Sequence, residues 1–176
     1  MTENQTQPWL KNYPASMQKT INPDRFSSLA EMIDETCQKF GPQTAFSNMG
    51  FEMTFSEIDE ASKKMAAFFQ SELKLKKGDR IVMMMPNLLQ YPIALFGAIR
   101  AGLVIINTNP LYTATEMQKC FADSGATTIV ILENFADKLE QILSQTQIKN
   151  IIVTEIGDVF PTFKRVLTNT VVRYVK

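Results

Sequence analysis

The sequence has 176 residues, of which 45% are hydrophobic and 20% charged, with 18 lysines and arginines balancing 18 acids and with no histidine. This composition is typical of a globular protein of about one domain, and it excludes a strongly basic nucleic-acid-binding protein. The lack of histidine excludes Ser-His-Asp and Cys-His catalytic arrangements and nearly every catalytic zinc site. The two cysteines, Cys37 and Cys120, cannot build a disulfide framework and indicate a reducing, cytoplasmic location.

The first 25 residues contain three prolines among polar side chains, which disfavours a helix of any length and predicts an extended arm. They do not have the pattern of a secretory signal, and no apolar run reaches the roughly 18 residues that cross a bilayer. Three apolar side chains either pin the arm to a neighbouring surface or belong to a loose tail, and the sequence leaves both open. They are Trp9, Leu10 and Tyr13.

Two helices and a hairpin are expected after the arm. Each helix begins with a Ser or Thr followed three residues later by Glu, the capping-box pattern. The expected spans run from the Ser28–Glu31 box to Gly41 and from the Thr54–Glu57 box to about Leu73. Between them, Met49-Gly50 predicts the turn of a hairpin formed by Thr44–Asn48 and Phe51–Thr54.

From Gly78 onward, short apolar runs alternate with helical patterns, which predicts a parallel sheet covered by helices on both faces. The expected strands are Ile81–Met85, Leu103–Ile106, Thr127–Leu132 and Ile151–Thr154. The expected helices are Leu88–Ala101, a second between the Thr113–Glu116 box and Gly125, and Phe135–Leu143. Gly97 lies inside the first of these helices, where a glycine permits close packing. The fold class is therefore α/β, with a small N-terminal β-hairpin.

Residues 159–176 predict a basic amphipathic helix, so the chain divides into an arm (1–25), an α/β subdomain (26–158) and this helix. Its apolar face either lies on a membrane surface or packs against the rest of a larger protein. No Gly, Asn or Pro ends the helix at Lys176, so we expect it to continue in a longer protein. The apolar face comprises Phe163, Val166, Leu167, Thr170, Val171 and Tyr174, the cations are Lys164, Arg165, Arg173 and Lys176, and no acid follows Asp158.

The residues themselves identify no active site. No two glycines stand as G-x-G, which excludes the Rossmann fingerprint, and the Walker A loop is also absent. Acids and lysines near helix ends suit the helix dipole. We interpret Asp79-Arg80 as a pair of residues in a surface turn, and Cys120 as an unreactive core residue. The dipole residues are Glu57, Asp59, Glu60, Lys74, Lys76 and Lys77. We therefore predict no catalytic, cofactor-binding or metal-binding residue.

Residues 78–117, GDRIVMMMPNLLQYPIALFGAIRAGLVIINTNPLYTATEM, closely resemble the N-terminal region of bacterial long-chain fatty-acid–CoA ligases, which belong to the adenylate-forming, AMP-binding superfamily. The likeness extends over essentially the whole chain. It implies that the chain forms part of the large N-terminal domain of such an enzyme. The matching motifs are Gly78–Arg80, Met84–Asn87, Gln90–Pro92, Ala94–Gly97, Arg100–Gly102, Asn109–Thr113 and Glu116.

The resemblance implies a two-step reaction in which ATP activates a fatty acid to an acyl-adenylate and CoA then takes the acyl group, with Mg²⁺ offsetting phosphate charge. The family's phosphate loop and its catalytic lysine are not in this sequence, so no catalytic residue is carried over, and we expect this chain alone to be inactive and to bind none of these cofactors. Lys74, Lys76, Lys77 and Lys176 do not stand in for that lysine. Asn109–Tyr112 either lines the CoA side of the site or forms a turn that satisfies its own backbone groups.

The resemblance also implies partners. Fatty acid and CoA would bind through the missing part of the protein. Apart from the resemblance, the cations beside the apolar face of residues 159–176 predict peripheral contact with the inner face of the cell membrane, and we expect the arm to help a homodimer form. Two alternative functions stay open: a ligase for medium-chain or aromatic acids, and a stand-alone α/β binding module without catalysis.

Overall fold

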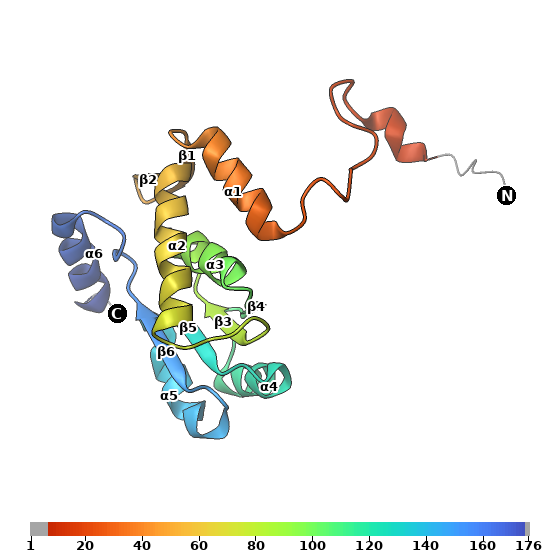
Figure 1. The fold of residues 1–176 in the computed structure, drawn as a ribbon. Coiled ribbons are helices and arrows are strands. Elements are labelled where there is room, and N and C mark those ends of the chain that lie inside the picture. Colours follow the sequence, from red (N-terminus) through yellow and green to blue (C-terminus); the bar gives the residue numbers. More distant parts are fainter. Residues whose placement is uncertain (1–6, 175–176) are drawn as a thin grey trace.

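The computed structural model describes residues 7–174 and shows an α/β fold in which a hairpin and two helices precede an alternation of strands and helices (Figure 1). The helices are α1 (Leu29–Phe40), α2 (Phe55–Ser71), α3 (Gln90–Arg100), α4 (Ala114–Ser124), α5 (Ala136–Ile142) and α6 (Thr162–Tyr174). The strands are β1 (Thr44–Asn48), β2 (Phe51–Thr54), β3 (Arg80–Met84), β4 (Val104–Asn107), β5 (Thr128–Leu132) and β6 (Asn150–Thr154). Short 3-10 turns occupy Pro8–Asn12, Glu133–Phe135 and Leu143–Gln145.

The four later strands form one parallel sheet in the order β4-β3-β5-β6, and β1 and β2 form the separate antiparallel hairpin. Both predictions are confirmed. Met49 and Gly50 form the hairpin turn with φ of 51° and 75°, the left-handed region that glycine adopts without strain. The expected strands are correct to within one residue at each end.

The central strand β3 shows why the sheet is covered on both faces. Its buried side chains belong alternately to two apolar clusters. Ile81 and Met83 join one cluster, whereas Val82 and Met84 join the other. The first cluster packs α2 and α3 on one face, and the second packs α4 and α5 on the opposite face. Continuous apolar strands are typical of a parallel sheet buried in this way.

Side-chain caps fix where α1, α2 and α4 begin. The Ser28 hydroxyl accepts a hydrogen bond from the Glu31 backbone N–H at 3.1 Å, but the Glu31 carboxylate accepts from Ser27 N at 2.7 Å, so this cap is not the reciprocal box that the pattern predicts. The other two boxes are reciprocal, as predicted. They are Thr54 with Glu57 and Thr113 with Glu116.

The α2–α3 contact is close because of one glycine. A Cβ on Gly97 would lie 2.8 Å from Met65 Cβ and 3.2 Å from the backbone oxygen of Ser62. The packing role predicted for this glycine is confirmed. The helix α2 ends at Ser71, two residues before the predicted end, and Lys74 follows in the left-handed region with φ of 55°.

The N-terminal arm leads away from the body of the molecule (Figure 1). It is not extended throughout, because Pro8 occupies the first position of a 3-10 turn, where a missing N–H costs nothing. Trp9 and Tyr13 are exposed, so they are not pinned to a neighbouring surface of the described chain. The first six residues of the predicted arm lie outside the described residues.

The C-terminal helix α6 contacts the domain through its polar side. Asn169 donates to Glu155 Oε2 at 2.6 Å and accepts from the Gly157 N–H at 2.8 Å. Arg173 lies 2.5 Å from Glu155 and 3.2 Å from Glu133. The apolar face of α6 therefore points outward. Its exposed side chains are Phe163, Val166, Leu167, Val171 and Tyr174.

Candidate functional site

The carboxyl edge of the parallel sheet is the place where an α/β fold of this kind binds ligands. The chain passes from β3 outward to β4 and then returns across β3 to β5, so the strand order reverses between β3 and β5. Three of the motif segments lie at or after the carboxyl ends of β3 and β4: Met84–Asn87, Gln90–Pro92 and Asn109–Thr113.

Gln90 bridges this edge from the start of α3. Its Nε2 donates to the backbone oxygens of Glu155 at 2.6 Å and Ile156 at 3.2 Å, in the loop after β6. The side chain is 8% exposed, and its Oε1 is buried without a hydrogen-bond partner among the described residues. Sequence reasoning named Gln90 only as part of a motif, because the loop that it holds lies 65 residues away.

Two further contacts hold the segment after β3. Asn48 of the hairpin donates through Nδ2 to the Asn87 carbonyl at 3.1 Å, and the Tyr91 hydroxyl donates to Asn107 Oδ1 at 3.0 Å. Together they fix the hairpin, the start of α3 and the end of β4 at one edge of the molecule. These groups position backbone segments, and none of them forms a nucleophile–base pair.

The loop Asn109–Tyr112 satisfies much of its own hydrogen bonding. Asn109 Oδ1 accepts from the Leu111 N–H at 3.0 Å, and the Tyr112 N–H donates to the Asn109 carbonyl at 3.1 Å. Lys138 Nζ donates to the Tyr112 carbonyl at 3.1 Å. The loop therefore forms the predicted turn that satisfies its own backbone groups. Its other predicted role, lining the CoA side of the site, stays a prediction.

The surface turn predicted at Asp79-Arg80 is confirmed for Asp79, which lies in the turn before β3, while the exposed Arg80 is the first residue of the strand. Asp79 Oδ2 accepts from the Lys76 backbone N–H at 2.8 Å and thereby closes the turn after α2. Arg80 donates through Nε and Nη2 to the Gly125 carbonyl at 3.3 and 3.2 Å. Each contact ties the amino end of β3 to a different neighbour.

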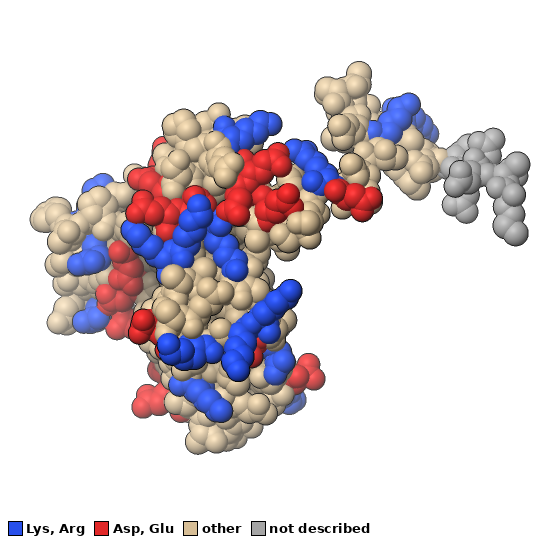
Figure 2. Space-filling model, viewed as in Figure 1, with Lys and Arg blue, Asp and Glu red and all other residues tan. Residues whose placement is uncertain are grey.

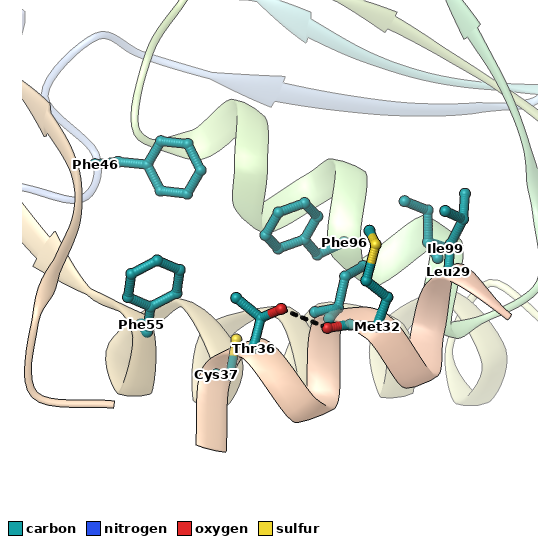
Figure 3. A pocket seen from close by; sticks show the side chains of 9 residues that line it. Leu29, Met32, Thr36, Cys37, Phe46, Phe55, Phe96 and Ile99 are labelled. Carbon is teal, nitrogen blue, oxygen red and sulfur yellow. Dashed lines mark hydrogen bonds between the residues drawn. The ribbon is translucent and has the colours of Figure 1, made fainter. Parts of the chain in front are cut away.

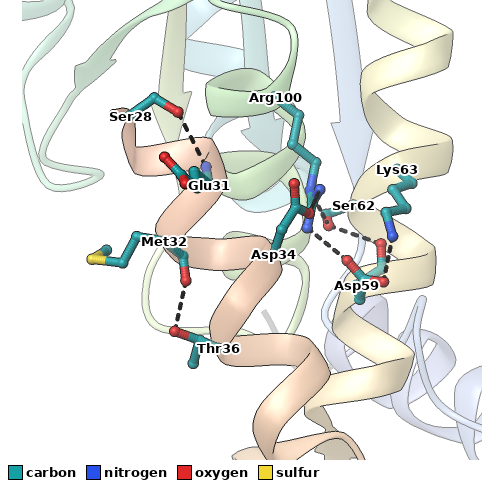
Figure 4. Close-up of polar contacts among 9 residues, drawn as sticks. All are labelled: Ser28, Glu31, Met32, Asp34, Thr36, Asp59, Ser62, Lys63 and Arg100. Atoms are coloured by element: carbon teal, nitrogen blue, oxygen red, sulfur yellow. Dashed lines mark hydrogen bonds and ion pairs between the residues drawn. The ribbon is translucent and has the colours of Figure 1, made fainter. Parts of the chain in front are cut away.

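Arg100 is the centre of a partly buried polar cluster between three helices (Figure 4). Its guanidinium, 9% exposed, pairs with Asp34 of α1 and lies 2.7 Å from Asp59 Oδ1 of α2. Its Nε donates to Ser62 Oγ at 3.1 Å, and Lys63 pairs with the other Asp59 oxygen at 2.6 Å. Asp59 therefore has a structural role, and Arg100 links the end of α3 to α1 and α2.

The two cysteines are free thiols. Cys37 is buried, and burial raises the pKa of its thiol, with the nearby Asp59 carboxylate adding to the effect. Cys120 is half-buried, with Sγ 3.7 Å from Thr108 Oγ1, so the core position predicted for it is only partly right. Across residues 7–174, no group of three or more Cys, Asp or Glu side chains is placed to hold a metal ion.

Charged side chains of opposite sign lie next to one another on the face drawn in Figure 2. This mixing agrees with the zero net charge of the sequence. A face of this kind lacks the single-sign field that steers nucleic acids to a protein.

Comparison with known proteins assigns the family. The model of the AMP-binding enzyme family matches residues 33–171, most of the chain. The chain belongs to the AMP-binding enzyme family. The resemblance predicted from the motif residues is thereby confirmed, and the scaffold described above is part of an AMP-binding domain.

The curated relatives of this AMP-binding chain include several bacterial ligases. A long-chain-fatty-acid–CoA ligase of Yersinia pestis is 50% identical over 168 residues, which are 96% of this chain and 30% of that protein. A Bacillus subtilis protein of the same name is 31% identical over 91% of this chain and 28% of its own length. The chain thus spans about 30% of the length of these relatives.

Solved structures share the fold. A long-chain-fatty-acid–CoA ligase of Archaeoglobus fulgidus superposes with a TM-score of 0.67 at 27% identity, covering 81% of this chain and 30% of that one. A benzoate CoA ligase of Burkholderia xenovorans superposes with a TM-score of 0.68 at 21% identity, covering 73% of this chain and 26% of that one. The second likeness shows the fold alone.

Proposed function

We propose that this chain is the N-terminal scaffold of a long-chain-fatty-acid–CoA ligase. The observation that carries the proposal is the 50% identity to such a ligase across 96% of the chain. In the complete enzyme, ATP would activate the fatty acid to an acyl-adenylate with release of pyrophosphate, and the CoA thiol would then displace AMP. Mg²⁺ would offset the phosphate charge.

The proposed contribution of this chain is positional. The contacts of Gln90, Tyr91 and Asn48 hold the segments after β3, β4 and β6 together at the carboxyl edge, where a neighbouring part of the enzyme would complete the site. Effects of this kind matter because misplacement of a reacting group by about 1 Å can cost about 100-fold in rate. The loop Asn109–Tyr112 is the part of this edge that we propose to face CoA.

The test is an assay of the whole protein encoded by the gene that contains this sequence, with ATP, Mg²⁺ and CoA, across fatty acids of increasing chain length and benzoate. We expect the highest kcat/KM for long-chain acids. A preference for medium-chain or aromatic acids would replace the substrate class. A reading frame that stops at Lys176, with no ligase activity, would favour the stand-alone binding module.

A second measurement tests the scaffold role directly. We expect the chain of 176 residues to show no heat of ATP binding in a titration calorimeter, because it contains neither a glycine-rich phosphate loop nor a G-x-G turn. Tight ATP binding by this chain would contradict the proposed division of labour. It would leave the fold and the family unchanged.

We also propose a cytoplasmic location with peripheral contact at the inner face of the cell membrane, and a homodimer. The free thiols and the outward apolar face of α6 support the first. Among residues 7–174, no helix is long and apolar enough to cross a bilayer. Of the predicted cations, Arg173 is not free for lipid because it pairs with Glu133 and Glu155, and Lys176 lies outside the described residues.

Vesicle flotation tests the membrane contact. Leu167→Glu places a charge on the outward face of α6 and is expected to abolish flotation with anionic vesicles. Leu111→Glu is the matched control, because Leu111 is 77% exposed in the loop after β4 and lies outside α6. Equal flotation of the wild type and the Leu167 variant would remove the proposal.

A further inference from the structure

An open apolar groove lies between α1, the hairpin and α3 (Figure 3). It contains about 510 Å³ of empty space. Its one hydroxyl group, on Thr36, donates to the Met32 carbonyl at 2.7 Å and so presents only its methyl group. The groove therefore fits an apolar ligand. Its lining residues are Leu29, Met32, Ile33, Thr36, Cys37, Phe46, Phe55, Phe96 and Ile99.

The groove is separate from the carboxyl edge of the sheet. Phe96 and Ile99 line it from α3, whereas Ala94 and Ala98, on the opposite side of the same helix, pack into the apolar cluster on the sheet. The helix α3 therefore lies between the groove and the sheet. A ligand bound in the groove would be held apart from the edge at which we propose that the enzyme completes its site.

The walls of the groove are held by aromatic contacts, while its rim stays open to water. The ring centroids of Phe46 and Phe96 are 6.3 Å apart, and those of Phe40 and Phe55 are 5.8 Å apart. Met32 is 38% exposed and Phe46 36%. A contiguous exposed apolar surface of this kind is typical of a ligand-binding groove or an interaction site.

A positive charge lies at one end of the groove. Lys39 follows Met32 by seven residues, about two helical turns, so both lie on the same side of α1. The Lys39 Nζ lies 5.1 Å from the centre of the Phe40 ring, which in turn packs against Phe55 of the groove. The ammonium group is thus placed beside the Phe55 end of the apolar surface.

This charge is available to an anion. Among residues 7–174, no carboxylate is paired with Lys39. The three acids of α1 do not line the groove, and each has a partner of its own. The pairs are Glu31 with Ser27, Asp34 with Arg100, and Glu35 with Arg25. An apolar surface that ends at one available cation matches an apolar chain with one negative head group.

We infer that the groove is an accessory binding site for a long-chain fatty acid, with the tail along α1 and the carboxylate at Lys39. The groove runs for about 15 Å from Leu29 to Lys39, at about 1.5 Å per helical residue, a length that suits an extended chain. The choice of a fatty acid rests on the proposed function. The site deepens that function, because it holds a second molecule of the substrate away from the carboxyl edge.

The test is equilibrium dialysis of the whole protein encoded by the gene against radiolabelled palmitate, without ATP, which counts the molecules bound per chain. We expect two, one at the reacting site and one in the groove. Met32→Glu should remove one of them, because it places a charge in the apolar surface that contacts the tail. Met49→Glu is the matched control and should still bind two, because Met49 lies in the hairpin turn, is 61% exposed and does not line the groove. Circular dichroism checks that each variant is folded.

Lys39→Gln tests the head group separately from the tail. It should weaken palmitate binding in the groove by about two- to fivefold, as expected for an exposed ion pair. Binding of hexadecanol, which has the same tail without the charge, should not change. Each methylene removed from the acid should weaken binding by up to about fourfold. Equal losses for the acid and the alcohol would overturn the inference, because the carboxylate would then not lie at Lys39.

The remaining outcomes separate this inference from the proposed function. If Met32→Glu still bound two molecules, the inference would be overturned and the proposed ligase would stand. A single palmitate on the wild type, unaffected by Met32→Glu, would also overturn it and would indicate that another part of the enzyme covers the groove. Loss of one palmitate in Met32→Glu, in a protein without ligase activity, would support the site and reject the proposed function.

Discussion

Replacement of Arg100 by methionine is expected to destabilise the fold substantially, because one nearly buried guanidinium joins α1, α2 and α3. Hydrogen bonds to charged groups contribute about 1.5–3 kcal/mol each, and Arg100 donates to Asp34, Asp59 and Ser62. The full sum is not lost in the variant. Asp34 is 43% exposed and regains water, and Asp59 keeps its pair with Lys63.

The expected loss is therefore about 2–3 kcal/mol, below the 3–5 kcal/mol found when one member of a fully buried pair is removed. Urea unfolding followed by circular dichroism measures it, and Tm should fall by about 4–12 °C at about 2–4 °C per kcal/mol. Arg100→Lys keeps the positive charge but lacks the planar guanidinium, so its stability should lie between those of the wild type and Arg100→Met.

Arg25→Met is the matched control for this prediction. Arg25 also pairs with a carboxylate, that of Glu35 at 3.2 Å, but the two side chains are 61% and 52% exposed. Exposed pairs of this kind contribute about 0–1 kcal/mol. If Arg100→Met lost no more stability than Arg25→Met, the three-helix cluster would not contribute to stability as argued.

Three further variants test other parts of the fold by the same urea titration. Gly97→Ala should destabilise by about 1–2 kcal/mol, because overpacking against Met65 at 2.8 Å outweighs the helix propensity gained; unchanged stability would show that α2 and α3 separate freely. Lys74→Gly should stabilise by about 0.5–1 kcal/mol by relieving the positive φ, and a loss would refute that strain. Hydrogen bonds from Thr54 hold the pKa of Glu57 below its ordinary 4.5, so its stabilisation is complete above pH 4.5 and is lost as the pH falls through the lowered value. The stability advantage of wild type over Glu57→Gln should therefore shrink below pH 4.5, and a constant difference would contradict this.

Local patterns predicted most of the secondary structure because their causes are local. The reciprocal box at Thr54–Glu57 and the left-handed turn at Met49-Gly50 each involve residues within four positions of one another. The alternation of apolar runs with helical patterns then left a parallel sheet as the simplest arrangement. The motif residues indicate the family by themselves, without any knowledge of tertiary contacts.

The contacts that shape the candidate site could not be predicted in the same way, because they join residues far apart in sequence. Gln90 bonds the carbonyl of Glu155, 65 positions away, and Arg100 pairs with Asp34, 66 positions away. Gln90 is the first residue of α3 and Arg100 the last, and the local sequence around each gives no sign of these distant partners. Arg80 is a third case, because its partner is the Gly125 carbonyl, 45 positions away.

The helix α6 shows that a correctly predicted amphipathic pattern does not say which face of the helix packs against the domain. An amphipathic surface helix ordinarily turns its apolar face to the core. Here Asn169 and Arg173 face the domain, because Glu155 offers both of them a carboxylate oxygen. Gly157 adds to this, since a Cβ there would lie 3.2 Å from the Arg165 carbonyl oxygen and 3.3 Å from its Cα, so glycine lets the helix approach closely. A helix bound by its polar side must leave its apolar side for a different surface, and the flotation experiment decides whether that surface is a lipid bilayer.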